Sequence, residues 1–112
     1  MRKLLVPVLA VAALAPLAGS ALAATRSVKV GDNWFVRPSG VPTVTVRKGT
    51  RVKWVWTGSS IHNVTVVRGP QRFRSTSRIA GSYAHRVTRR GTYTLICTIH
   101  GAADQKMKLE VK

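Results

Sequence analysis

Apolar and polar residues alternate in short runs along this chain, as in residues 52–56 and again in residues 107–111 near the C-terminus. A period of two, with many β-branched and aromatic residues, is typical of strands that bury one face. About eight such runs, separated by turn residues and without helical periodicity after residue 23, predict an all-β sandwich or barrel. The polar, basic segment 71–81 is expected to be a surface loop attached through Phe73 and Ile79. The expected strands are residues 27–30, 34–36, 44–46, 52–56, 64–67, 83–87, 92–97 and 107–111.

The first 23 residues have the composition of an export signal. Two basic residues precede a long apolar run, and Ala21–Ala23 offers the small residues that a signal peptidase recognises. The apolar run is short for a membrane-spanning helix and contains two prolines, and Ser20 stands where a lipoprotein signal needs its lipidated cysteine. We therefore predict a secretory signal peptide over residues 1–23 and one exported domain over residues 24–112, located in the periplasm, at the cell surface or in the medium.

The charge of the chain is strongly positive and limits the kinds of site it can build. There are 19 Lys and Arg residues against 3 Asp and Glu, a formal net charge of +16, or +14 without residues 1–23. So few carboxylates exclude a calcium loop or a two-metal nuclease site. The positive charge predicts attraction to an acidic protein, to the cell envelope or to nucleic acid without sequence specificity, unless it serves only solubility.

Cys97 is the only cysteine of the chain, so neither an internal disulfide nor a four-cysteine metal site can form. It ends one expected strand, His100 follows it in a turn, and His62 lies at the start of another strand. Strand ends of a sandwich meet at one end of the fold, which would bring together two imidazoles and a thiol. That donor set suits copper with a weak axial fourth ligand. Taken alone, a histidine is most often a surface or core side chain, and a cysteine is most often a small buried apolar residue.

Three segments of the chain resemble cupredoxins of the plastocyanin and amicyanin type. Residues 43–54 (TVTVRKGTRVKW) are similar to the family's two strands around a glycine turn, leading to an aromatic residue. The sequence HNV at 62–64 resembles the first ligand motif, and GTYTLICTIH at 91–100 resembles the G-T-Y-x-x-x-C-x-x-H motif. With the last strand, the similarity covers nearly all of residues 24–112. The resemblance implies a Greek-key β-sandwich of about eight strands.

The resemblance also implies the residues of a mononuclear (type 1) copper site. His62, Cys97 and His100 match the three equatorial ligands. Asn63 matches the residue whose backbone N–H points at the cysteine sulfur and whose side chain ties the two ligand loops together. Thr98 is the expected partner of that side chain, and both residues would hold the ligands in place.

The fourth, axial ligand departs from the family pattern, in which a methionine is usual. Aligning the last strand places Gln105 in the axial position, with Met107 as the alternative if the loop bulges. A harder amide oxygen favours Cu(II), so a glutamine site is expected to have a lower reduction potential than a methionine site. His85 lies inside an expected strand and is interpreted as an ordinary surface or core histidine.

The resemblance implies that the protein carries one electron between redox partners by cycling between Cu(I) and Cu(II), without catalysing a reaction of its own. We expect a monomer that docks with an acidic redox protein and does not span a membrane, and whose basic surface could associate with the envelope. The alternatives are a copper-binding module for storage or delivery, and a metal-free polyanion-binding domain whose binding weakens steeply with salt.

Overall fold

The computed structural model describes residues 24–112, so the predicted signal peptide at residues 1–23 lies outside the described residues. Within the described part, no helix has the length and apolar character needed to cross a membrane. The described residues form eight strands. These are β1 (Thr25–Gly31), β2 (Trp34–Phe35), β3 (Thr43–Val46), β4 (Arg51–Trp56), β5 (Thr65–Arg68), β6 (Ser82–Arg86), β7 (Gly91–Ile96) and β8 (Lys106–Val111).

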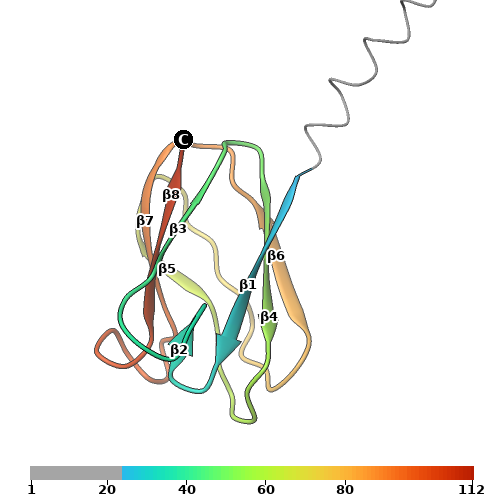
Figure 1. Cartoon of the computed structure of the whole chain (residues 1–112), viewed down its shortest axis with the longest axis vertical. Coiled ribbons are helices and arrows are strands. Elements are labelled where there is room, and N and C mark those ends of the chain that lie inside the picture. The colour runs from blue at the N-terminus through green and yellow to red at the C-terminus, as the bar shows by residue number, and fades with distance from the viewer. Residues whose placement is uncertain (1–23) are drawn as a thin grey trace, which may run out of the picture.

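The strands form two four-stranded sheets that face each other, with strand orders β2-β1-β4-β6 and β3-β8-β7-β5 (Figure 1). Both sheets are mixed, because β1 runs parallel to β4 and β3 runs parallel to β8, while the other pairs are antiparallel. The predicted all-β sandwich of about eight strands is therefore confirmed.

The core lies between the sheets and is built by the alternation seen in the sequence. In β4 the side chains at 52, 54 and 56 are buried, and in β8 those at 107, 109 and 111 are buried. Trp54 is fully buried, and the rings of Phe73 and Tyr83 lie 5.8 and 5.9 Å from its ring centroid. Each large side chain buried in this way contributes about 1.5–3 kcal/mol to the free energy of unfolding.

The segment between β5 and β6 is hydrogen-bonded to strand β5 and is not the unpaired surface loop that was expected. It crosses from one sheet to the other and covers the edge of β5. Its backbone accepts a 3.1 Å hydrogen bond from Val66 N–H at Phe73, and Ser75 N–H donates to the Val64 carbonyl at 2.8 Å. Phe73 packs against the core as expected. The expectation for Ile79 is wrong, because 60% of its surface is exposed.

The strand expected at residues 34–36 is shorter in the structure, where β2 contains only Trp34 and Phe35. Asn33 and Val36, on either side, have positive φ angles of 66° and 69°. This backbone conformation is uncommon for residues other than glycine and ends regular strand pairing. The β1–β2 turn, the β4–β5 connection and the β7–β8 loop all lie at the end of the sandwich opposite the C-terminus (Figure 1).

Candidate metal centre

The three residues predicted as equatorial ligands lie together at this end of the sandwich. The ligand atoms of His62, Cys97 and His100 are all within 4.8 Å of one another. Cys97 Sγ is 3.4 Å from His100 Nδ1, and the centroids of the two imidazole rings are 4.8 Å apart. His62 and Cys97 are fully buried, whereas His100 is half-buried.

Strand pairing explains why residues so far apart in the sequence meet here. β5 and β7 are antiparallel neighbours in which Thr65 pairs with Ile96. The residues just before β5 therefore lie beside those just after β7, which places His62 next to Cys97. His100 returns toward Cys97 because the chain turns tightly, with Gly101 N–H donating to the Cys97 carbonyl at 2.8 Å.

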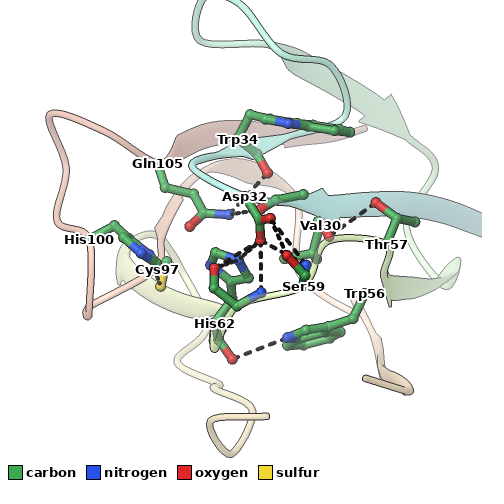
Figure 2. A network of polar contacts seen from close by, with 12 residues as sticks. Val30, Asp32, Trp34, Trp56, Thr57, Ser59, His62, Cys97, His100 and Gln105 are labelled. Atoms are coloured by element: carbon green, nitrogen blue, oxygen red, sulfur yellow. Dashed lines mark hydrogen bonds and ion pairs between the residues drawn. The ribbon is translucent and has the colours of Figure 1, made fainter. Parts of the chain in front are cut away.

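The backbone of His62 is held on both sides. Its N–H donates to the Arg78 carbonyl, and its carbonyl accepts the Arg78 N–H, both at 3.0 Å. The indole N–H of Trp56 donates to the same His62 carbonyl at 3.2 Å (Figure 2). These bonds fix where the imidazole enters the site.

The ring of His62 is oriented by a carboxylate that the sequence analysis did not single out. His62 Nε2 is 2.8 Å from Asp32 Oδ1 (Figure 2). It is also 3.0 Å from Ser60 Oγ. His62 Nδ1 is buried and has no hydrogen-bond partner among the described residues. If Nε2–H donates to the carboxylate, the lone pair of the neutral ring is on Nδ1, which is the form that binds a metal ion.

Asp32 lies in the β1–β2 turn, and several donors stabilise its charge. Besides His62, its carboxylate accepts the backbone N–H groups of Ser59 and Ser60, each at 3.1 Å, and both serine hydroxyls at 3.2 and 2.8 Å. The hydrogen bond from His62, followed by those from the two serines, holds the pKa of Asp32 far below its usual range. Asp32 is one of only three acidic residues, and this scarcity is the sequence signal that could have identified it.

Gln105, the residue predicted as axial ligand, offers a free oxygen to the site. Its side chain is fully buried, and its Nε2 donates to the carbonyls of Gly31 and Trp34 at 2.9 and 3.0 Å. Its Oε1 is buried without a partner among the described residues and lies on the side that faces Cys97 and the two histidines (Figure 2). An unpaired buried carbonyl oxygen is costly, so a bound cation would stabilise this arrangement.

The register of the β7–β8 hairpin favours Gln105 over Met107 as a fourth donor. Cys97 N–H donates to the Gln105 carbonyl at 3.2 Å, so these two residues are level with each other. Met107 instead pairs with Leu95, farther from the loop, and is buried within the hydrophobic core. The loop bulge that would bring Met107 to the site is absent from this pairing.

Asn63 joins the two ligand-bearing segments through its side chain. Its Nδ2 donates to Thr98 Oγ1 at 2.8 Å, and its Oδ1 accepts the Thr98 N–H at 3.1 Å. Asn63 Oδ1 also accepts the Thr65 hydroxyl at 2.8 Å. The segment before β5 is thereby tied to the residue that follows Cys97. A hydrogen bond from the Asn63 N–H to the sulfur stays a prediction.

His85 lies outside this cluster. Its ring stacks on Phe73 with centroids 4.0 Å apart and an interplanar angle of 15°. Burial lowers the pKa of His85, since the charged imidazolium would be poorly solvated there. These contacts agree with the interpretation of His85 as an ordinary histidine beside the core.

The donor set fits a copper ion. One thiol, two imidazole nitrogens and a weaker oxygen donor form the combination that trigonal copper sites use. Four buried side-chain atoms lack a hydrogen-bond partner among the described residues, and two of them, His62 Nδ1 and Gln105 Oε1, are ligand-type atoms at this end of the sandwich. Bound metal would satisfy both of them, so the residues present suit the site that the sequence predicted.

Comparison with known proteins gives a likeness in structure rather than in sequence. No protein-family model matches the chain, and no curated protein matches it. A Cu(I) structure of an amicyanin variant with methionine replaced by glutamine has 24% identity and a TM-score of 0.65, over 79% of this chain and 82% of that one.

Two further solved structures show the same arrangement. A purple cupredoxin from Nitrosopumilus maritimus matches with 16% identity and a TM-score of 0.65, over 78% of this chain and 99% of that one. A copper-containing nitrite reductase from Thermus scotoductus SA-01 matches with 23% identity and a TM-score of 0.66, over 79% of this chain but only 22% of the reductase. The eight strands described above are therefore those of the cupredoxin fold.

Proposed function

We propose that this protein binds one copper ion through His62, Cys97 and His100, with Gln105 as the axial ligand, and acts as a one-electron carrier. The observation that carries the proposal is the convergence of a thiol and two imidazoles within 4.8 Å at one end of the sandwich. The amicyanin variant and the nitrite reductase with the same fold are both described as copper proteins, which supports the choice of metal.

Copper at this site would supply one-electron chemistry by alternating between Cu(I) and Cu(II). The protein would keep the ligand atoms in place in both oxidation states of the copper. His62 is fixed through its backbone and through Asp32, and Cys97 is fixed by the hairpin and by the link between Asn63 and Thr98. Little rearrangement then accompanies electron transfer, which is the property that an electron carrier requires.

His100 is the ligand residue that reaches the surface, so a redox partner would approach there. Exposed apolar residues occur on the two histidine-bearing segments: Ile61 and Ile99 are 44% and 47% exposed, and Ala102 and Ala103 are also exposed. An apolar patch of this kind suits a short-lived contact between proteins. The positive charge of the domain would steer an acidic partner and would raise the association rate more than the affinity.

The proposal also covers removal of the signal peptide, the oligomeric state and the location of the protein. We infer that residues 1–23 are removed on export and that residues 24–112 act as a monomer in the periplasm, at the cell surface or in the medium. The proposal assigns the protein no catalytic turnover of its own.

Titration of the purified protein with Cu(II) tests the copper site. We expect an intense visible absorption from thiolate-to-copper charge transfer that saturates at one copper per chain and disappears reversibly on reduction. Cys97→Ser should lose the band while keeping its far-UV circular dichroism, and His85→Gln should keep the band as a matched control. A colourless protein that binds no stoichiometric copper would refute the proposal.

Two further measurements separate the alternatives. A carrier retains copper in both oxidation states against a competing chelator, whereas a storage or delivery module releases it readily in one of them. Electron paramagnetic resonance of the copper-loaded protein tests the axial ligand. Gln105→Met should change the spectrum and raise the reduction potential, while Met107→Leu should change neither. The reverse result would assign the axial position to Met107.

A further inference from the structure

A pocket of about 440 Å³ lies beside the candidate metal centre. The crossing segment between β5 and β6 forms one wall, contributing Arg74, Thr76 and Ser77, and the ligand-bearing segments contribute Asn63 and Thr98. All residues that line it are polar, and none of them is acidic. None of the candidate metal ligands lines the pocket, so copper binding does not account for its polar lining.

Five hydroxyl groups line the pocket, and three of them keep a proton to donate. Those of Thr65 and Ser75 already donate, to Asn63 Oδ1 and to the Thr76 carbonyl, each at 2.8 Å. Asn63 Nδ2 donates to Thr98 Oγ1 at 2.8 Å and to Ser77 Oγ at 3.3 Å, and Arg78 Nη2 donates to Thr76 Oγ1 at 2.9 Å. The hydroxyl oxygens of Thr76, Ser77 and Thr98 therefore each already accept a hydrogen bond from an N–H group. A hydroxyl that accepts in this way keeps its own O–H proton for another partner.

The possible acceptors in the pocket are already in use. Asn63 Oδ1 accepts both the Thr98 N–H and the Thr65 hydroxyl, so the amide has no free acceptor directed at a ligand. Its assignment is fixed by the Thr98 N–H, which requires an oxygen at that position. What remains exposed is a set of O–H donors together with one cation.

That cation is Arg74. Its side chain is exposed, and it has no acidic partner among the residues that the structure describes. A guanidinium presents a planar fork of donors that matches two oxygens of one anion. A guanidinium beside three O–H donors, with no carboxylate to compete, is chemically suited to an anion carrying several oxygens.

We propose that this pocket binds a tetrahedral oxyanion, a phosphate or sulfate group, through the Arg74 guanidinium and the hydroxyls of Thr76, Ser77 and Thr98. The proposal rests on residues that are not copper ligands, so it stands or falls independently of the proposed function. Because Thr98 follows Cys97 directly, a bound oxyanion would lie next to the loop that carries the cysteine and His100.

Titration of the purified protein with inorganic phosphate and with sulfate tests the proposal, with amide NMR shifts as the readout. Chloride replaces the oxyanion in the control, so that ionic strength is constant. We expect saturable shifts centred on residues 74–77 and 98. Phenyl phosphate forms a third arm: tighter binding than inorganic phosphate indicates that the group is carried on a larger ligand, and equal binding indicates the free ion.

Two charge-matched variants distinguish a built site from general attraction by a cationic protein. Arg74→Gln should weaken phosphate binding about tenfold, as expected for loss of a charge-assisted hydrogen bond, and Ser77→Ala should weaken it less. Arg72→Gln removes the same charge two residues away, from a side chain that does not line the pocket, and should leave the affinity nearly unchanged. Equal weakening by both arginine variants, or shifts that never saturate, would overturn the proposal.

Discussion

The replacement of Asn63 by alanine tests how strongly the two ligand-bearing segments depend on one side chain. Asn63 is 5% exposed and makes four side-chain hydrogen bonds, of which three are between 2.8 and 3.1 Å and one is 3.3 Å. At about 1 kcal/mol for each of the three shorter bonds, Asn63→Ala should lower the free energy of unfolding by about 3 kcal/mol. For a domain of this size, that corresponds to a decrease in Tm of about 15 °C.

Urea denaturation of the metal-free protein measures this change, and the slope of the transition should stay constant because the exposed area is the same. Thr45→Ala is the control, since it removes only an exposed 3.3 Å hydrogen bond to Glu110 and should cost less than about 0.5 kcal/mol. A double-mutant cycle of Asn63→Ala with Thr98→Ala should give a coupling energy of about 1 kcal/mol. A loss below about 1 kcal/mol for Asn63→Ala would refute the reasoning.

Three other substitutions probe different parts of the structure. Asp32→Asn removes the carboxylate that orients His62 and should weaken copper binding about 10- to 100-fold, measured by chelator competition; unchanged affinity would show that the ring needs no such support. Tyr93→Phe removes a hydroxyl that donates to the Arg89 carbonyl at 2.7 Å and should cost about 1 kcal/mol in urea denaturation. Because burial lowers the pKa of His85 below its usual 6.5, the unfolded chain binds the proton more readily and stability decreases as the pH falls through that value. His85→Phe should therefore lose less stability than the wild type between about pH 7 and 5, as followed by thermal melting.

Features that depend on local pattern could be predicted from the sequence. Alternation at residues 52–56 and 107–111 placed the right side chains in the core, because each residue's face follows from a period of two. The meeting of His62, Cys97 and His100 was also predictable, since strand ends gather at the ends of a sandwich and the spacing of the motifs resembled a known family.

Features that depend on contacts between turns could not be predicted in this way. The contact of Asp32 with His62 joins two turns that are 30 residues apart, and it exists only because β1 pairs with β4 in one particular register. The exposure of Ile79 could not be predicted either, because hydrophobicity alone does not show which side of a crossing segment faces the core. The positive φ of Val36 is unusual for a β-branched residue, and no sequence rule would place it there.

The unequal restraint on the two imidazoles has a consequence for how metal enters and leaves. Hydrogen bonds hold His62 at its backbone and at its ring, and it is sealed from solvent. His100 is half-buried and sits on a tight turn outside the sheets. If copper binds as proposed, loading and release would therefore take place on the His100 side, where one side chain could move away while the other donors stay assembled. The rate of copper exchange would then depend on residues 98–104, and it could change in evolution or by design without altering the sandwich.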